Sequence, residues 1–292
     1  MDRRGMSEST LEVDTEAAAD AFGVLSDDSR VDILLALWDA EQSSFEDLRR
    51  AAGIDDSGRF NYHLDQLVDR FVRKTDDGYR LTSLGANVVD LLLDARFGLS
   101  PSPIDEPTNA DCPACGERLH VYYEDGDMRL ACPSCETVVH YGFFPPRGRA
   151  TRTAEETIDA YSRQVWRDVT LAHRGVCPHC SGRMETRIEV DPDWAIDVAA
   201  QGRCRDCGAP YSFPIGLHLL AEPAVVSFLA DHGTFIDERR FWELDFVYGD
   251  AVSVVSESPP RYQVTITAGA ERLEVTLDEQ CVVVDIARHV PH

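Results

Sequence analysis

Four Cys-x-x-Cys pairs constrain this chain more than any other feature, because they arrange themselves into two similar sets. A Cys-x-x-Cys turn places two sulfurs on one side, and a hairpin between two such turns completes the tetrahedral shell that zinc prefers. The segment CPACGERL at 112–119 parallels CPHCSGRM at 177–184, so the unit is repeated. We therefore predict two zinc ribbons. Their ligands are Cys112, Cys115, Cys132 and Cys135 in the first ribbon, and Cys177, Cys180, Cys204 and Cys207 in the second.

Disulfides and an iron–sulfur cluster are the alternatives to zinc. The start of the chain, MDRRGMSEST, lacks the apolar segment of a signal peptide, and the longest apolar run, near 88–93, is too short to cross a bilayer. We therefore expect a cytoplasmic protein with no membrane partner, where thiols stay reduced and bind metal. A four-cysteine shell leaves no open position, so the zinc is expected to be structural. Redox or metal sensing by zinc-bound thiolates is the functional alternative.

The charge of the chain is strongly acidic, with 52 Asp and Glu against 28 Lys and Arg and a net charge of −24. Lys74 is the one lysine. Acid-rich, lysine-poor surfaces suit a very salty cytoplasm, where the self-repulsion is screened. The composition favours a halophilic protein over an ordinary acidic one.

The first 96 residues have a helical pattern with one strand pair. We expect helices over 15–25, from 28 onward, from 45 to 52, from 57 to 71 and over 84–96, with a hairpin formed by VRKT and YRLT around the turn DDG. The second helix is expected to bury Val31, Leu34, Leu35 and Trp38, which lie at i, i+3, i+4 and i+7. The fourth is expected to bury Phe60, Leu64, Leu67, Val68 and Phe71. Helix, helix, turn, helix and hairpin is the order of a winged helix-turn-helix domain.

The residues LSDDSRVDIL, FNYHLDQL and GYRLTSLG, within 21–85, resemble the ArsR-type winged-helix transcriptional regulators, particularly their haloarchaeal relatives. The part with two ribbons is similar to haloarchaeal ArsR-like regulators that carry C-terminal domains. The resemblance implies that the fourth helix enters the major groove of DNA, that the hairpin contacts the backbone, and that the protein dimerises through its first and fifth helices. Metal-sensing members carry a cysteine pair on the third helix, where this chain has SFEDLRRAA. Arsenic or cadmium sensing at that position is therefore not implied.

The fourth helix and the hairpin also carry side chains suited to DNA. Arginine suits guanine and phosphate, while Asn and Gln suit adenine. Residues 57–82 hold five basic and four acidic residues, a locally basic segment in an acidic chain. The predicted DNA contacts are Arg59, Asn61, Tyr62, His63, Gln66, Arg70, Arg73, Lys74 and Arg80. The alternative is a winged helix used for protein contacts, whose polar residues are only solvated.

The predicted fold class is α+β and multidomain. We expect a winged-helix domain over 1–96, a proline-containing linker over 97–111, a first ribbon over 112–146, a helix with the second ribbon over 151–215, and a small α+β domain over 216–292. The last domain has an apolar helix pair broken by Pro223, followed by four strand-like runs that include the ninth cysteine, Cys281.

These features predict a dimeric transcriptional regulator that binds double-stranded DNA and answers to an unknown small-molecule or protein effector. The alternative is an adaptor whose ribbons bind nucleic acid or the transcription machinery, with the winged helix as a protein-interaction module. Seven arginines against four acids within 147–183 favour that alternative. We expect no enzymatic activity, because the sequence has no Ser/His/Asp spacing, no phosphate-binding glycine loop and no open metal site.

Overall fold

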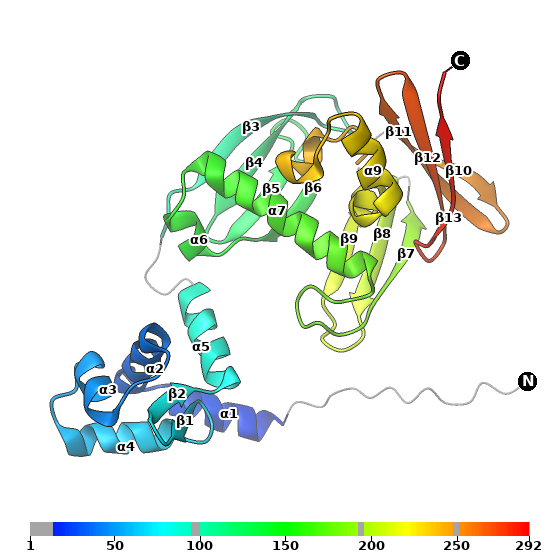
Figure 1. Ribbon diagram of the computed structural model, residues 1–292. Coiled ribbons are helices and arrows are strands. Elements are labelled where there is room, and N and C mark those ends of the chain that lie inside the picture. Colours follow the sequence, from blue (N-terminus) through cyan, green and yellow to red (C-terminus); the bar gives the residue numbers. More distant parts are fainter. Residues whose placement is uncertain (1–13, 95–99, 192–195, 248–250, 292) are drawn as a thin grey trace, which may run out of the picture. The chain divides into compact units, whose positions relative to one another are not determined.

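The computed structural model describes residues 14–94, 100–191, 196–247 and 251–291. The chain divides into two compact units, Met1–Leu99 and Ser100–His292 (Figure 1). The architecture is mixed α+β, with several antiparallel sheets. Within the described ranges, no helix has the length and apolar character that crossing a membrane requires.

Unit 1 consists, in its described part, of helices and one hairpin in the predicted order. Its elements are α1 (Thr15–Val24), α2 (Asp28–Ala40), α3 (Phe45–Ala51), α4 (Ser57–Leu67), β1 (Val72–Thr75), β2 (Gly78–Leu81) and α5 (Ser83–Asp94). Short polar side chains begin the helices by accepting hydrogen bonds from free backbone N–H groups. Asp27, Ser44 and Asp56 cap α2, α3 and α4 in this way.

The core of unit 1 lies between α2 and α4. The predicted apolar face of α4 is confirmed for Phe60, Leu64 and Leu67, but the helix ends at Leu67, so Phe71 is buried from the turn that follows and Val68 is only half-buried. The predicted stripe on α2 is wrong except for Leu34, because the helix buries Ile33 and Leu37 and leaves Trp38 exposed. The segment VDILLALW is apolar around most of its circumference, so the periodicity alone does not select the buried face.

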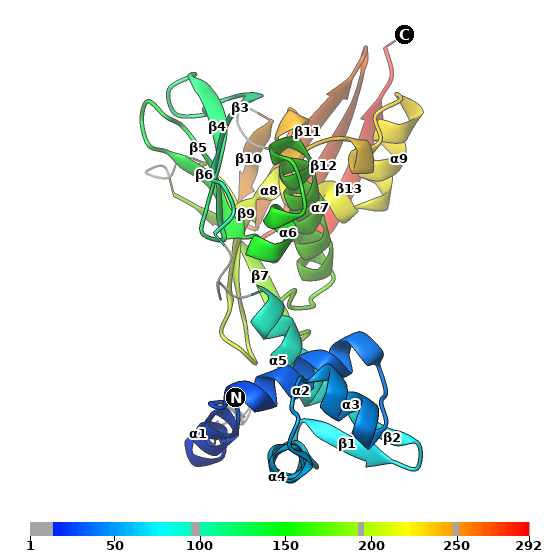
Figure 2. The ribbon, with the colours of Figure 1, turned by 90° about the vertical axis from the view of Figure 1, so that its left-hand side faces the viewer.

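Unit 2 contains three antiparallel sheets and a long helix. The first sheet is β3 (Ile104–Asp111), β4 (Arg118–Glu124), β5 (Asp127–Ala131) and β6 (Val138–Phe143); the second is β7 (Met184–Val190), β8 (Val198–Cys204) and β9 (Pro210–Pro214); the third is β10 (Val252–Glu257), β11 (Pro260–Ala268), β12 (Glu271–Asp278) and β13 (Val283–His289). The helices are α6 (Pro146–Ala150), α7 (Ala154–His173), α8 (Ile215–His218), α9 (Pro223–Asp231) and the short 3-10 helices η1 (Leu219–Ala221), η2 (Ile236–Glu238) and η3 (Phe241–Glu243). In Figure 2, α6 and the start of α7 lie near the viewer and the third sheet lies behind them.

The predicted linker over 97–111 is wrong for residues 104–111, which form β3 and pair with β4. Ile104 anchors the strand with a buried side chain. Pro107, which cannot donate a hydrogen bond, is accommodated because β3 is an edge strand with a register shift after that residue. Residues 97–99 lie outside the described ranges.

The two ribbons and the C-terminal segment, predicted as separate domains, share one hydrophobic core. Helix α7 begins with a capping box between Thr153 and Glu156. It buries Tyr161, Val165 and Val169 in that core, together with side chains from all three sheets. The physical reason is size, because a ribbon of this length is too small to bury a core of its own. The two cysteine-rich segments are therefore parts of one larger unit.

Candidate functional site

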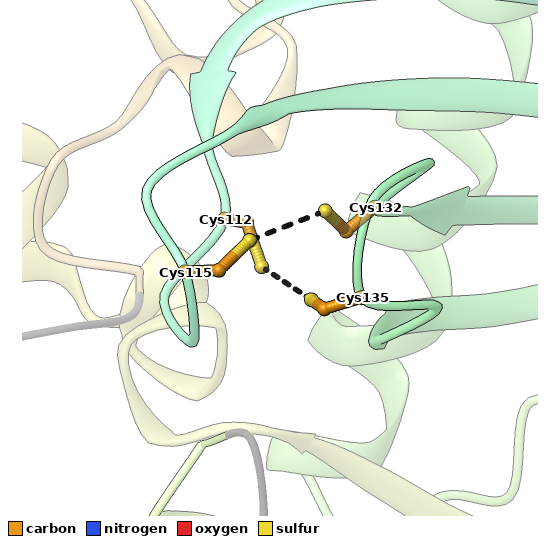
Figure 3. A group of neighbouring side chains, drawn as sticks. All are labelled: Cys112, Cys115, Cys132 and Cys135. Atoms are coloured by element: carbon orange, nitrogen blue, oxygen red, sulfur yellow. Dashed lines mark hydrogen bonds between the residues drawn. The ribbon is translucent and has the colours of Figure 1, made fainter.

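The first cysteine cluster joins the turn before β4 to the turn after β5 (Figure 3). The sulfurs of Cys112 and Cys135 lie 3.7 Å apart, and those of Cys115 and Cys132 lie 3.5 Å apart. All four sulfurs lie within 4.8 Å of one another. Tetrahedral zinc with bonds of about 2.3 Å would place its sulfurs about 3.8 Å apart. The spacing therefore suits a metal ion and is much longer than the roughly 2.05 Å of a disulfide.

The second cluster repeats this arrangement at the end of the β7–β9 sheet. The sulfurs of Cys177 and Cys207 lie 3.8 Å apart, and those of Cys180 and Cys204 lie 3.6 Å apart. In each cluster two cysteines are buried and two are exposed. The eight predicted ligands are thus brought together as two groups of four, as the spacing predicts.

All four Cys-x-x-Cys turns share one backbone conformation. The residue that follows the second cysteine of each turn has a positive φ: 76° at Gly116, 59° at Glu136, 62° at Ser181 and 73° at Gly208. This conformation lets the chain reverse tightly, so that the N–H of the residue after the second cysteine donates to the carbonyl of the first cysteine. The N–H of Gly116, for example, donates to the carbonyl of Cys112 at 2.9 Å. The repeat seen in the sequence is therefore also a repeat of local structure.

Backbone and side-chain donors favour the thiolate form that a metal requires. The hydrogen bond between the Cys135 sulfur and the Thr137 hydroxyl, 3.2 Å long, lowers the pKa of Cys135 to about 6. The N–H of Cys207, 3.5 Å from the Cys204 sulfur, lowers the pKa of Cys204 to about 7.

Two other thiols, those of Cys115 and Cys180, have raised pKa values, because adjacent sulfurs cannot all ionise without a cation. The backbone at Glu117 acts to lower the pKa of Cys115, but hydrogen bonds with Cys135 and Cys132 raise it to about 12. A bound divalent cation removes this conflict, since it deprotonates coordinating thiols. The donor set therefore fits a metal ion with four sulfur ligands, and such a closed shell stabilises the fold without offering a catalytic position.

The second candidate site is the exposed face of α4 in unit 1. The predicted contact residues Arg59, Asn61, Tyr62 and Gln66 are exposed on this helix, and Arg70 is exposed in the turn that follows it. The Arg59 guanidinium donates to the Ser29 hydroxyl at 2.9 Å, and the Asn61 amide donates to Asp65 at 2.9 Å. Sequence reasoning missed Ser29, which connects Arg59 to α2.

His63 does not belong to this face: the prediction that it lies at the border of the exposed side is wrong, because its side chain is buried. The residue is 6% exposed because it follows Phe60 by one helical turn and so points toward α2. Its Nδ1 accepts from the Arg30 Nε at 3.4 Å and lies 3.6 Å from a carboxylate oxygen of Asp27. His63 therefore positions α4 against α2.

The β1–β2 hairpin carries the remaining predicted contacts. Arg73, Lys74 and Arg80 are exposed, and Arg73 pairs directly with Arg80 across the two strands. Like charges in that position are unfavourable unless an anion lies nearby. Among the described residues, no carboxylate lies within 4.0 Å of either guanidinium.

The hairpin is fixed to the start of α3 by a feature that the sequence did not reveal. Ser43 and Tyr79 exchange two backbone hydrogen bonds, of 3.0 and 2.9 Å. Gly78 lies so close to this contact that a Cβ at its position would lie 2.3 Å from the Ser43 carbonyl oxygen. The hairpin is therefore held rigidly beside the helices.

Two family models match the chain. Residues 18–92, within unit 1, match the model described as Domain of unknown function (DUF7347). Residues 109–283, within unit 2, match the model described as Domain of unknown function (DUF7351). No curated protein and no solved structure matches the chain. Because the second of these models spans more than half of its length, the chain belongs to the DUF7351 family.

Proposed function

We propose that this protein is a cytoplasmic, DNA-binding transcriptional regulator of the ArsR-like winged-helix type. In this proposal α4 is the recognition helix and β1–β2 is the wing. The observation that carries the proposal is the polar side of α4, where Arg59, Asn61 and Gln66 are exposed while Phe60, Leu64 and Leu67 are buried. These side chains can donate to base edges in the major groove.

The order and packing of the elements support the proposal. Helix α2 contacts both α3 and α4, and the hairpin follows α4 directly, which is the arrangement of a winged helix-turn-helix. The opposed Arg73 and Arg80 on the wing are suited to phosphates of the DNA backbone.

Exposed apolar residues on α1 and α5 support the proposed homodimer. Helix α1 has no buried residue in the chain by itself, and Phe22 is 66% exposed. On α5, Leu84 and Leu91 are 48% and 57% exposed. A second copy that covers these side chains would remove apolar surface from water.

Zinc is the metal that we propose for both cysteine clusters, and its role there is to complete the fold of unit 2. When bound, zinc supplies a positive charge that keeps the thiolates ionised. The effector of the regulator stays unnamed in this proposal.

A binding experiment with the full chain tests the recognition helix. Duplexes enriched from a random pool by the wild-type protein would be titrated with Arg59→Ala, Gln66→Ala and a control, Arg50→Ala, on the exposed side of α3. Loss of a base contact should cost about 1–3 kcal/mol and relax the sequence preference at one position. The control should bind like the wild type. Equal binding by all the variants would contradict the assignment of α4.

Salt dependence provides a second test, because counterion release weakens as salt rises. A halophilic regulator should depend more on base contacts and dimerisation than on phosphates. We expect a shallow fall in affinity with KCl, and a steep fall would contradict this part of the proposal.

A further inference from the structure

Six arginines of unit 2 are not used by the proposed recognition helix or by the metal sites. Sequence reasoning connected them with the ribbons, but they lie on α6, on the turn after it, on α7 and at the residue that ends α7; Figure 1 shows both helices. They are Arg147, Arg149, Arg152, Arg163, Arg167 and Arg174.

Most of these arginines are not neutralised by the acids of the chain. Arg149 donates to the main-chain carbonyls of Ser102 and Arg152, and Arg152 donates to the carbonyl of Gly148. In the described part of the chain, Arg163 and Arg174 have no carboxylate within 4.0 Å.

The acids on α7 already have partners. Glu156 closes the capping box, Asp159 bonds to Arg240 at 2.7 Å, and Asp168 bonds to Arg167 at 2.9 Å. The explanation that the basic segment serves the chain's own carboxylates therefore applies to Arg167, and in part to Arg152, whose charge acts on Glu156. In a chain with 52 acids and 28 basic residues, leaving the other arginines unpaired suggests an external anionic partner.

Three exposed arginines form one surface: Arg163 and Arg174, which have no carboxylate partner in the described part of the chain, and Arg167, which pairs with Asp168. Arg163, Trp166, Arg167 and Arg174 follow one another at helical spacing and are exposed, opposite the buried residues of α7. Arg152 extends this surface, since it lines a hollow together with Arg163 and with two acids that have partners of their own, Glu156 and Asp159. At 1.5 Å per residue, the distance along the helix from Arg163 to Arg174 is about 16 Å.

We propose that this surface, Arg152–Arg163–Trp166–Arg167–Arg174, binds the phosphate backbone of double-stranded DNA, as a second contact beyond α4. The stripe extends over about five base steps of 3.4 Å. Arginine forks match phosphate oxygens, and the indole N–H of Trp166 is a further donor. The surface carries no sequence-reading amide, so its contribution is independent of DNA sequence.

The test isolates this surface from the recognition helix. Full-length protein carrying Arg59→Ala and Gln66→Ala is the parent, and the probe is a random-sequence duplex at low KCl. Arg163→Gln with Arg174→Gln should weaken binding about tenfold and reduce the salt slope by about 1.8, which corresponds to two phosphates.

A matched control removes the same charge elsewhere on unit 2. Arg187→Gln with Arg272→Gln acts on exposed arginines that pair with Glu189 and Glu274. The control should bind like the parent, and lysine at 163 and 174 should restore the salt slope. The proposal would be overturned if the control and the test variant lost affinity equally, or if neither lost affinity. Tighter binding to the matching single strand than to the duplex would also overturn it. If Arg59→Ala with Gln66→Ala leaves the sequence preference of the wild type unchanged, the assignment of α4 fails. That outcome is independent of the effect of the α7 substitutions, so the two proposals can fail separately.

Discussion

Replacing Cys132 by alanine tests how far the metal sites support unit 2. Cys132 is 2% exposed and belongs to the first cluster, while Cys281 is 4% exposed and lies outside both clusters. Replacing either cysteine by alanine removes one buried sulfur atom. The difference in stability between the two variants therefore measures the loss of the metal ligand apart from the loss of packing volume. Cys281→Ala is therefore the control.

The expected magnitudes differ strongly. Cys281→Ala removes one buried sulfur, at a cost of about 1 kcal/mol, which for a domain of 150–250 residues lowers Tm by about 2–4 °C. Cys132→Ala opens a closed shell, and structural zinc contributes apparent free energies of about 10–16 kcal/mol in small domains. A typical domain has only about 5–15 kcal/mol of net stability. Since both ribbons share one core, loss of the first site should unfold the whole of unit 2.

Zinc content measured by mass spectrometry, together with thermal unfolding in KCl, distinguishes the two outcomes. The wild type and Cys281→Ala should each bind two zinc ions per chain. Cys132→Ala should bind fewer zinc ions and lose the unfolding transition of unit 2. Two zinc ions in Cys132→Ala, with a Tm shift no larger than that of the control, would refute this account of the core.

Three further predictions concern packing, pH and assembly. A Cβ at Gly85 would lie 2.1 Å from the Phe71 carbonyl oxygen, so Gly85→Ala should destabilise unit 1 by about 3 kcal/mol. A Cβ at Gly23 would meet open space, so Gly23→Ala should stabilise α1 by about 0.5–1 kcal/mol. Denaturant unfolding measures both changes, and equal effects of the two substitutions would contradict the structure. Burial lowers the pKa of His140 to about 4, so the unfolded chain takes up a proton between about pH 6.5 and 4 while the folded chain does not, and stability falls as the pH falls through this window. His140→Phe should retain about 3 kcal/mol more than the wild type does near pH 4, relative to pH 7, as measured by unfolding at both pH values, and identical losses would disprove the role of His140. Phe22→Asp should convert the proposed dimer to a monomer in light scattering, and an unchanged mass would argue against the α1 interface.

The sequence predicted both cysteine clusters, because their grouping depends on fixed local spacing. A Cys-x-x-Cys turn needs only adjacent residues to place two sulfurs, and the repeat of the motif identified both clusters. The shared core was not predictable in the same way. It depends on contacts between segments far apart in the chain, such as Tyr161 of α7 with His140 of β6, whose rings lie 5.8 Å apart.

Errors in the helical unit have a similar origin. The face of α4 was predicted because it alternates clearly between apolar and polar residues, but α2 is apolar on too many sides for periodicity to choose one. His63 was assigned to the exposed face because a polar residue at its border is ordinarily solvated. The contacts with Arg30 and Asp27 that bury it come from another helix and leave no local signal.

The most direct test of the proposed regulator is a genome-wide map of the DNA that it occupies in cells. The wild type would be compared with the double variant Arg59→Ala, Gln66→Ala and with the control Arg50→Ala, each at equal protein level. We predict discrete sites shared by the wild type and the control, and loss of those sites in the double variant. The same sites occupied to the same extent by all three proteins would contradict sequence recognition by α4.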